Sequence, residues 1–137
     1  MTLGQTAKKN YVEEKLNCAV STLMAASDVY GLGLTKEDAK LVTGFGGGIG
    51  CGNLCGALAG AVAALGRILL PEGEMYNMDF HDVCAGFVAA FEEKWGTTLC
   101  APIKEVNVTD PVNRCSKTVV ETGDMLQNFV DNILNNR

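Results

Sequence analysis

Six cysteines in a chain of 137 residues are the side chains best suited to chemistry. Cys51 and Cys55 follow a glycine-rich stretch that begins at Gly44. Thiolates ligate metals and iron–sulfur clusters or cycle through disulfides, and glycines let another group approach the backbone closely. A site here requires the other cysteines to converge on this loop. The six are Cys18, Cys51, Cys55, Cys84, Cys100 and Cys115.

The spacing of the cysteines rules out several familiar sites. Three residues separate Cys51 from Cys55, so the pair is neither the thioredoxin-like C-x-x-C motif nor the C-x-x-C-H site of covalent haem. The paired knuckles of zinc ribbons and the tight run of bacterial ferredoxins are absent as well. We therefore expect no covalent haem, and only the fold can bring scattered thiols together.

The glycine-rich stretch does not match a nucleotide-binding loop. No Gly-Lys-Ser/Thr follows it, and no β-branched strand precedes it. Its glycines can instead offer backbone N–H groups to the sulfurs of a cluster. The glycines expected to support a site in this way are Gly46, Gly47, Gly48 and Gly56.

Composition describes an acidic globular protein. Hydrophobic residues make up 47% and charged residues 20%, and the net charge is −5. No basic stripe points to nucleic acid. The longest apolar run, 54–70, is interrupted by Arg67 and predicts a buried helix. We therefore expect no membrane span. The first residues lack the apolar run of a signal peptide, and we expect a cytoplasmic protein.

Cysteine content itself leaves two interpretations open. In a reducing compartment, clustered cysteines more often serve metal or redox chemistry than structural disulfides. The alternative is six unrelated buried thiols, because free cysteine is among the most buried residue types.

Apolar periodicity predicts an all-α fold, one compact domain over 1–137 with about five helices and a glycine-rich loop before the central helix. The expected helices cover 7–30, a short segment ending near 43, 54–69, 79–95 and a last helix after Pro111. Residues 97–110 are the least regular, with an extended run from 103 to 108.

The predicted helices give the cysteines different roles. Cys18 lies on a small-residue face that favours close packing by another element, and Cys84 falls within an apolar stripe as a core thiol. Cys115 lies on the first turn of the last helix, where the oriented N–H groups favour a thiolate and lower its pKa. His81, the only histidine, is expected to be solvated.

Several of these motifs together resemble a known family of redox-active proteins, abbreviated C_GCAxxG_C_C. Its members carry four signature cysteines and a Cys-Gly-Ala-x-x-Gly motif in a chain of similar length. The segments that carry the resemblance occur in the family's order and are Asn17–Ala19, Gly44–Gly48, Cys55–Gly60, Trp95–Cys100 and Cys115.

The resemblance implies which thiols matter. It assigns the signature positions to Cys18, Cys55, Cys100 and Cys115, and leaves Cys84 and Cys51 outside the signature. Cys51 remains a possible additional ligand because it lies in the glycine loop. A related domain occurs in split-Soret cytochromes, which links the family to an iron–sulfur centre beside haem.

Three functions follow from these cysteines. The first is an iron–sulfur protein that exchanges electrons with a redox partner protein not identified by the sequence. The second is a metal-free thiol–disulfide protein, with Cys18 paired to Cys55 and Cys100 paired to Cys115. The third is a structural zinc module that holds residues 97–110. The small-residue helix faces could also serve a homodimer.

Overall fold

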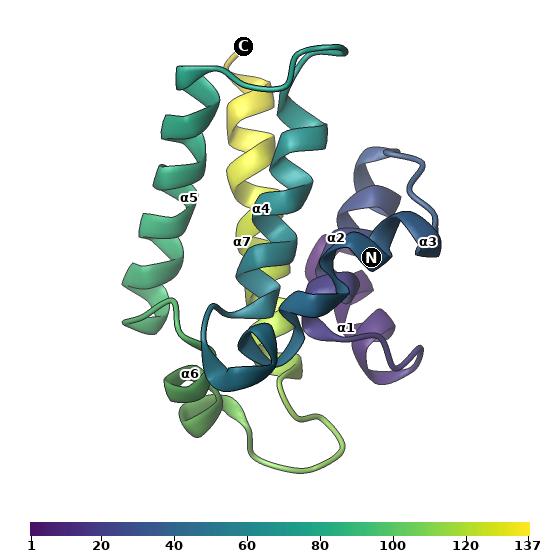
Figure 1. The fold of residues 1–137 in the computed structure, drawn as a ribbon, viewed down its shortest axis with the longest axis vertical. Helices are drawn as coiled ribbons and strands as arrows, with labels where there is room; N and C mark the ends of the chain where they lie inside the picture. The colour runs from purple at the N-terminus through teal and green to yellow at the C-terminus, as the bar shows by residue number, and fades with distance from the viewer.

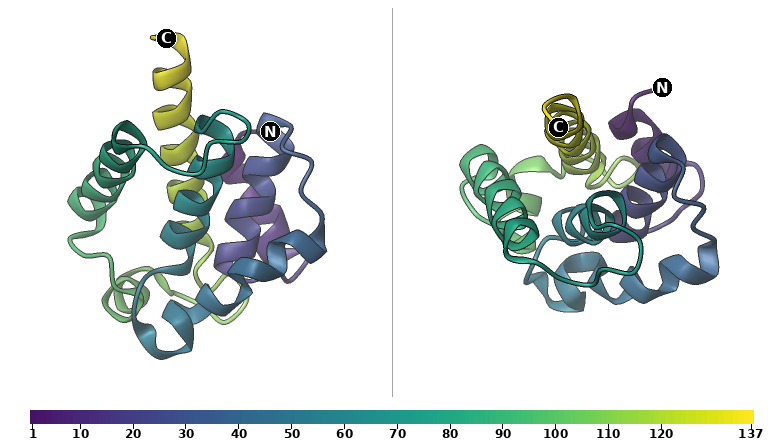
Figure 2. Two further views of the ribbon diagram at one scale, coloured as in Figure 1. Left: turned by 45° about the horizontal axis from the view of Figure 1, so that its top comes forward. Right: turned by 90° about the horizontal axis from the view of Figure 1, so that it is seen from above.

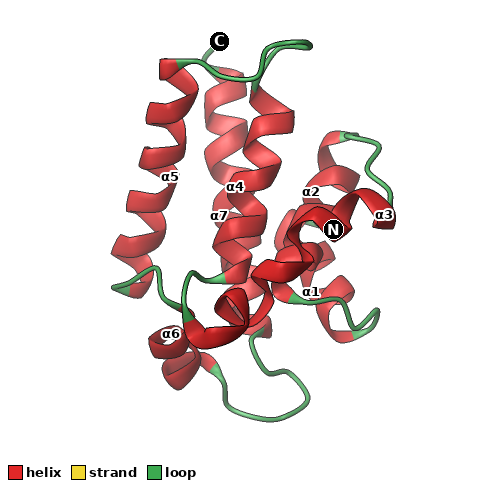
Figure 3. Cartoon of the chain, in the orientation of Figure 1, coloured by secondary structure: helices red, strands yellow, loops and turns green.

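The computed structural model describes residues 1–137, which form seven α-helices and no strand (Figures 1 and 3). The prediction of an all-helical domain is confirmed, whereas the expected number of about five helices is wrong. A 3₁₀ turn (η1) and a π-type turn (η2) precede the central helix. The elements are α1 Leu3–Val12, α2 Cys18–Tyr30, α3 Lys36–Ala39, η1 Lys40–Phe45, η2 Gly48–Gly52, α4 Gly56–Leu69, α5 Met78–Trp95, α6 Cys100–Asn107 and α7 Ser116–Asn135.

The single helix predicted over 7–30 is two helices, α1 and α2, packed against each other. The backbone turns between them at Lys15, whose φ is 57°. Asn17 then caps α2, because its Oδ1 accepts a hydrogen bond from Val20 N at 2.9 Å. Cys18 is therefore the first residue of a helix rather than part of a helix interior.

The segment 97–110, expected to be irregular or extended, contains the helix α6. Its buried residues Cys100, Ile103 and Asn107 recur at helical spacing. Pro102 is tolerated because it lies in the first turn, where its missing N–H has no intrahelical partner to lose. As a result Cys100 also begins a helix.

The core lies between α1, α2, α4 and α7, and α5 covers it from one side (Figures 1 and 2). Leu58, Leu65, Val119 and Leu126 are almost completely buried there. The predicted apolar stripe of α5 is only partly buried: Phe87 and Phe91 are enclosed, whereas the rest, including Cys84, is half-buried at the margin of the core. None of the helices has the length and apolar character needed to cross a membrane.

Glycines allow the helices to cross closely. On α4, a Cβ at Gly60 would collide with the backbone carbonyl of Ala19 on α2. On α7, a Cβ at Gly123 would lie 2.7 Å from Gly4 Cα and 3.0 Å from Gly4 N on α1. The small-residue face predicted for the central helix thus serves close helix packing, and a similar contact joins the first and last helices.

We expect Gly123→Ala to destabilise the fold. The added methyl meets backbone atoms that cannot rotate away, so α1 must shift, at a cost of about 1–3 kcal/mol. This should exceed the gain in helix propensity of about 1 kcal/mol. Urea unfolding measures the change in the free energy of unfolding.

Gly86→Ala on α5 is the matched control. Its Cβ would meet only Phe129 Cζ at 3.9 Å, an ordinary contact. This variant should gain up to about 1 kcal/mol from helix propensity alone. Equal effects of the two substitutions would refute the close contact between α1 and α7.

Candidate functional site

A cavity of about 190 Å³ lies where α2, α4, α6 and α7 begin. In Figure 1, α4 and α7 both begin toward the lower end of the molecule. Four thiols from four separate segments line it: Cys18, Cys55, Cys100 and Cys115. The fold therefore brings together the four cysteines of the predicted signature.

Each of these cysteines stands at the start of a helix. Cys18 and Cys100 are the first residues of α2 and α6, and Cys55 and Cys115 are the N-cap residues of α4 and α7. The first turn of a helix presents N–H groups without intrahelical partners and carries a partial positive charge. Four such ends surround the cavity.

Three of these four helices lack a side-chain cap. The N-cap residues of α4, α6 and α7 make no side-chain capping hydrogen bond. By contrast, Thr2, Thr35 and Asn77 cap α1, α3 and α5, which begin away from the cavity, and Asn17 caps α2. Helix starts without a side-chain cap are thus concentrated around the four thiols.

Backbone pairing holds Cys55 and Cys100 side by side. Leu54 and Leu99 form an isolated antiparallel bridge. Cys55 N donates to Thr98 O at 2.8 Å, and Cys100 N donates to Asn53 O at 2.5 Å. These bonds join the end of the glycine loop to the start of α6, so the two thiols are fixed relative to each other.

Asn17 and Gly56 hold Cys18 at the cavity. Besides capping α2, Asn17 donates from Nδ2 to Thr43 O at 2.8 Å, which ties the start of α2 to η1. Gly56 leaves room for the thiol, since a Cβ there would collide with Cys18 Sγ. The prediction that Cys18 faces a closely packed element is confirmed, and that element is the start of α4.

Cys115 is held by Tyr11 of α1. The Tyr11 hydroxyl oxygen accepts a hydrogen bond from Cys115 N at 3.3 Å. The guanidinium carbon of Arg114 lies 4.6 Å from the centre of the Tyr11 ring, a cation–π geometry. Tyr11, Lys104 and Arg114 all line the cavity, although no sequence motif identifies them as site residues.

All the charged side chains that line the cavity are basic. Lys104 and Arg114 line it, and no aspartate or glutamate does. This contrasts with a net charge of −5 for the whole chain. Basic groups and helix N-termini together make the cavity favourable for an anionic group.

Burial nevertheless favours the protonated form of Cys55, Cys100 and Cys115, because it raises the pKa of each. It raises the pKa of Cys55 to about 11, against an opposing effect of the amides of Leu58 and Ala57. Burial also raises the pKa of Cys100 and of Cys115, although Lys104 acts to lower both. The expectation that a helix N-terminus lowers the pKa of Cys115 is therefore wrong, because desolvation outweighs it.

The four glycines expected to support the site all lie at or beside it. Gly47 and Gly56 line the cavity. A Cβ on Gly48 would lie 2.5 Å from Cys100 Cβ, and one on Gly46 would lie 2.5 Å from Asn17 Nδ2. The glycine loop thus packs directly on two of the segments that carry thiols.

The remaining candidate side chains lie outside the cavity. Cys51 is exposed on η2, with its Sγ 3.5 Å from Gly48 O. Cys84 is half-buried on α5, and His81 is exposed near Tyr76 at the start of that helix. None of the three lines the cavity.

All six thiols are free. No three Cys, His, Asp or Glu side chains lie close enough together to hold a single metal ion. The thiols instead surround a space many times the roughly 15 Å³ that one water molecule requires.

Comparison with known proteins places this arrangement in a family. No curated protein and no solved structure matches the chain. Residues 16–129, most of the chain, match the family described as "putative redox-active protein (C_GCAxxG_C_C)". The four cysteines around the cavity lie within the matched residues, whereas Tyr11 precedes them. The chain belongs to the C_GCAxxG_C_C family.

Proposed function

We propose that this protein transfers electrons through an iron–sulfur cluster ligated by Cys18, Cys55, Cys100 and Cys115. The observation that carries the proposal is the convergence of these four thiols, from four separate segments, on one cavity. Four cysteine thiolates are the usual ligand set of such clusters.

The shape of the site favours a polynuclear group over a single ion. Structural zinc requires four ligands about 2.0–2.3 Å from one point. The thiols here are not grouped closely enough for that, yet they share a cavity of about 190 Å³. This geometry supports a cluster placed between the thiols.

Electrostatics support an anionic occupant. Four thiolates give the site excess negative charge, and the protein offers uncapped helix N-termini with Lys104 and Arg114 to balance it. The raised pKa of Cys55 means that an iron ion must displace the thiol proton, so ligation and proton release are linked.

Each part of the chain has a task in this proposal. A bound cluster supplies one-electron transfer. The bridge between Leu54 and Leu99 fixes two ligands, and Asn17 and Gly56 fix a third. The low exposure of Cys55 and Cys100 limits the access of water, and the backbone amides of the glycine loop would donate to the sulfurs of the cluster. A partner protein would exchange electrons at this end of the molecule.

The proposal is tested by anaerobic purification, with analysis of iron, acid-labile sulfide and zinc beside a visible absorption spectrum. We expect iron and sulfide in similar amounts and a broad visible band. A colourless, metal-free protein whose thiol count changes on reduction would contradict the proposal and support a dithiol mechanism. Stoichiometric zinc would instead indicate a structural site.

Cys115→Ala should abolish most of the bound iron and the visible band, because one of four ligands is lost. Cys84→Ala is the matched control, since both thiols are half-buried and only Cys115 lines the cavity. Cys51→Ala should also retain its iron, because that thiol is exposed outside the cavity. Iron per chain is the measurement, and retention of iron by Cys115→Ala would remove this residue from the ligand set.

Gly56→Ala should likewise lower cluster content although it removes no ligand. Its Cβ would collide with Cys18 Sγ and lie 2.8 Å from Phe45 O, so the thiol must leave its position. Gly66→Ala, on the same helix, meets only Phe80 Cζ at 3.7 Å and should keep its iron. Equal iron in the two purified variants would mean that the position of Cys18 does not matter.

A further inference from the structure

We propose that Thr118 donates a hydrogen bond to the group bound in the cavity, and that Asn107 holds the Thr118 hydroxyl in place for this role. In the proposed cluster protein the acceptor is a sulfur of the cluster, so the inference rests on the proposed function. Neither residue belongs to the motifs that indicate the family, and the structure assigns both to the site.

Thr118 and Asn107 form a buried polar pair beside the cavity. Asn107 Nδ2, on α6, donates to Thr118 Oγ1, on α7, at 2.9 Å. Each of the two residues is only 3% exposed. Thr118 lines the cavity, whereas Asn107 lies behind it and does not. The pair therefore places a buried hydroxyl group at the cavity and supports it from the side away from the thiols.

The hydroxyl proton of Thr118 has no acceptor in the protein. Its oxygen accepts from Asn107, which leaves the O–H group free to donate. A threonine in a helix can donate to the carbonyl four residues earlier, as Thr22 does to Cys18 O at 2.9 Å. For Thr118 that residue is Arg114, which precedes the N-cap of α7 and has a φ of 43°. Its carbonyl therefore lacks the helical orientation that would accept the proton.

A buried donor without an acceptor destabilises a protein unless a ligand or water satisfies it. Because Thr118 lines the cavity, a group bound between the thiols is the acceptor within its reach. Sulfur atoms of a cluster would serve as such acceptors. The Thr118 hydroxyl is thus unsatisfied in the protein alone and becomes satisfied when the site is filled.

A hydrogen bond to a cluster sulfur has a direct redox consequence. It stabilises negative charge on the sulfur, and the reduced state carries more of that charge. The Thr118 hydroxyl would therefore raise the reduction potential. Asn107 is a positioning residue, because it acts on the site only through the oxygen of Thr118.

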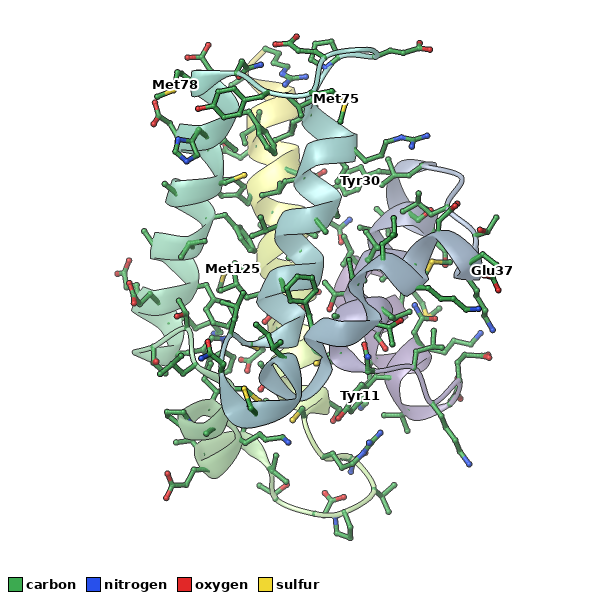
Figure 4. The ribbon with its side chains drawn as sticks, viewed as in Figure 1. Tyr11, Tyr30, Glu37, Met75, Met78 and Met125 are labelled. Atoms are coloured by element: carbon green, nitrogen blue, oxygen red, sulfur yellow. The ribbon has the colours of Figure 1, made fainter.

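Thr118→Val tests the proposal, since it keeps the branched shape of the side chain and removes the hydroxyl, whereas Thr118→Ser keeps the hydroxyl. Thr122→Val is the matched control. Thr122 is a buried threonine of the same helix whose Oγ1 also lacks an acceptor, but it does not line the cavity. It lies one turn farther along α7, toward Met125, and Figure 4 shows Met125 well away from Tyr11, which lines the cavity.

The first measurement is urea unfolding of the reduced, cluster-free proteins. Thr118→Val should lower the urea midpoint, because the buried side chain of Asn107 loses its one hydrogen-bonding partner. Thr122→Val should raise the midpoint, because a methyl group replaces a buried hydroxyl that has no partner. Equal midpoints of the two variants would overturn the pairing of Asn107 with Thr118, and the proposal with it.

The second measurement is the midpoint potential of the cluster-loaded proteins. Thr118→Val should have a lower potential than the parent protein, while Thr118→Ser and Thr122→Val should match the parent. A loaded Thr118→Val protein with an unchanged potential would overturn the role of Thr118 and leave the cluster intact. A parent protein that contains neither iron nor acid-labile sulfide would instead overturn the proposed function and this role together.

Discussion

The fold of this protein depends on which groups accept hydrogen bonds from the N–H groups at the starts of its helices. Helix N-termini expose N–H groups that require acceptors, and here α4, α6 and α7 begin without a side-chain cap. They meet at a cavity that contains thiols and two basic groups but no carboxylate. The fold is therefore built around a place for negative charge, which the four cysteines can provide once they lose their protons.

Two opposing effects decide the state of those cysteines. Desolvation favours the neutral thiol, while helix ends, Lys104 and Arg114 favour the thiolate. Desolvation prevails at Cys55, Cys100 and Cys115, where the pKa is raised. In the proposed cluster protein, these positive surroundings would stabilise the thiolates once iron replaces their protons.

The sequence was informative about the site because its chemistry is concentrated in one residue type. The cysteines, with the glycines beside them, identified the residues that line or border the cavity. The order of the motifs indicated the family. Apolar periodicity alone does not reveal that Asn17 caps α2, so it predicts one helix where the structure has α1 and α2. The sequence does not identify Tyr11 as a site residue, because a single aromatic residue on an amphipathic helix is usually part of the core. Only the packing of α1 against α7 brings its hydroxyl to Cys115 N.

Helix α6 shows a second limit of predicting secondary structure from local sequence patterns. The run of residues after Pro102 has strand-like character, yet burial of Ile103 and Asn107 at helical spacing prevails. Tertiary packing overrode local preference there. Cys84 is the converse case: its position in an apolar stripe predicted a core thiol, but α5 covers the core loosely and leaves it half-buried.

The contact between the first and last helices has a consequence for biosynthesis. Gly4 meets Gly123 and Tyr11 meets Cys115, so α1 has its main partner at the far end of the sequence. During translation all four thiols are synthesised before α7, which helps to enclose them. Such distant pairing slows folding. Those thiols therefore remain accessible to oxidants until α7 packs against α1.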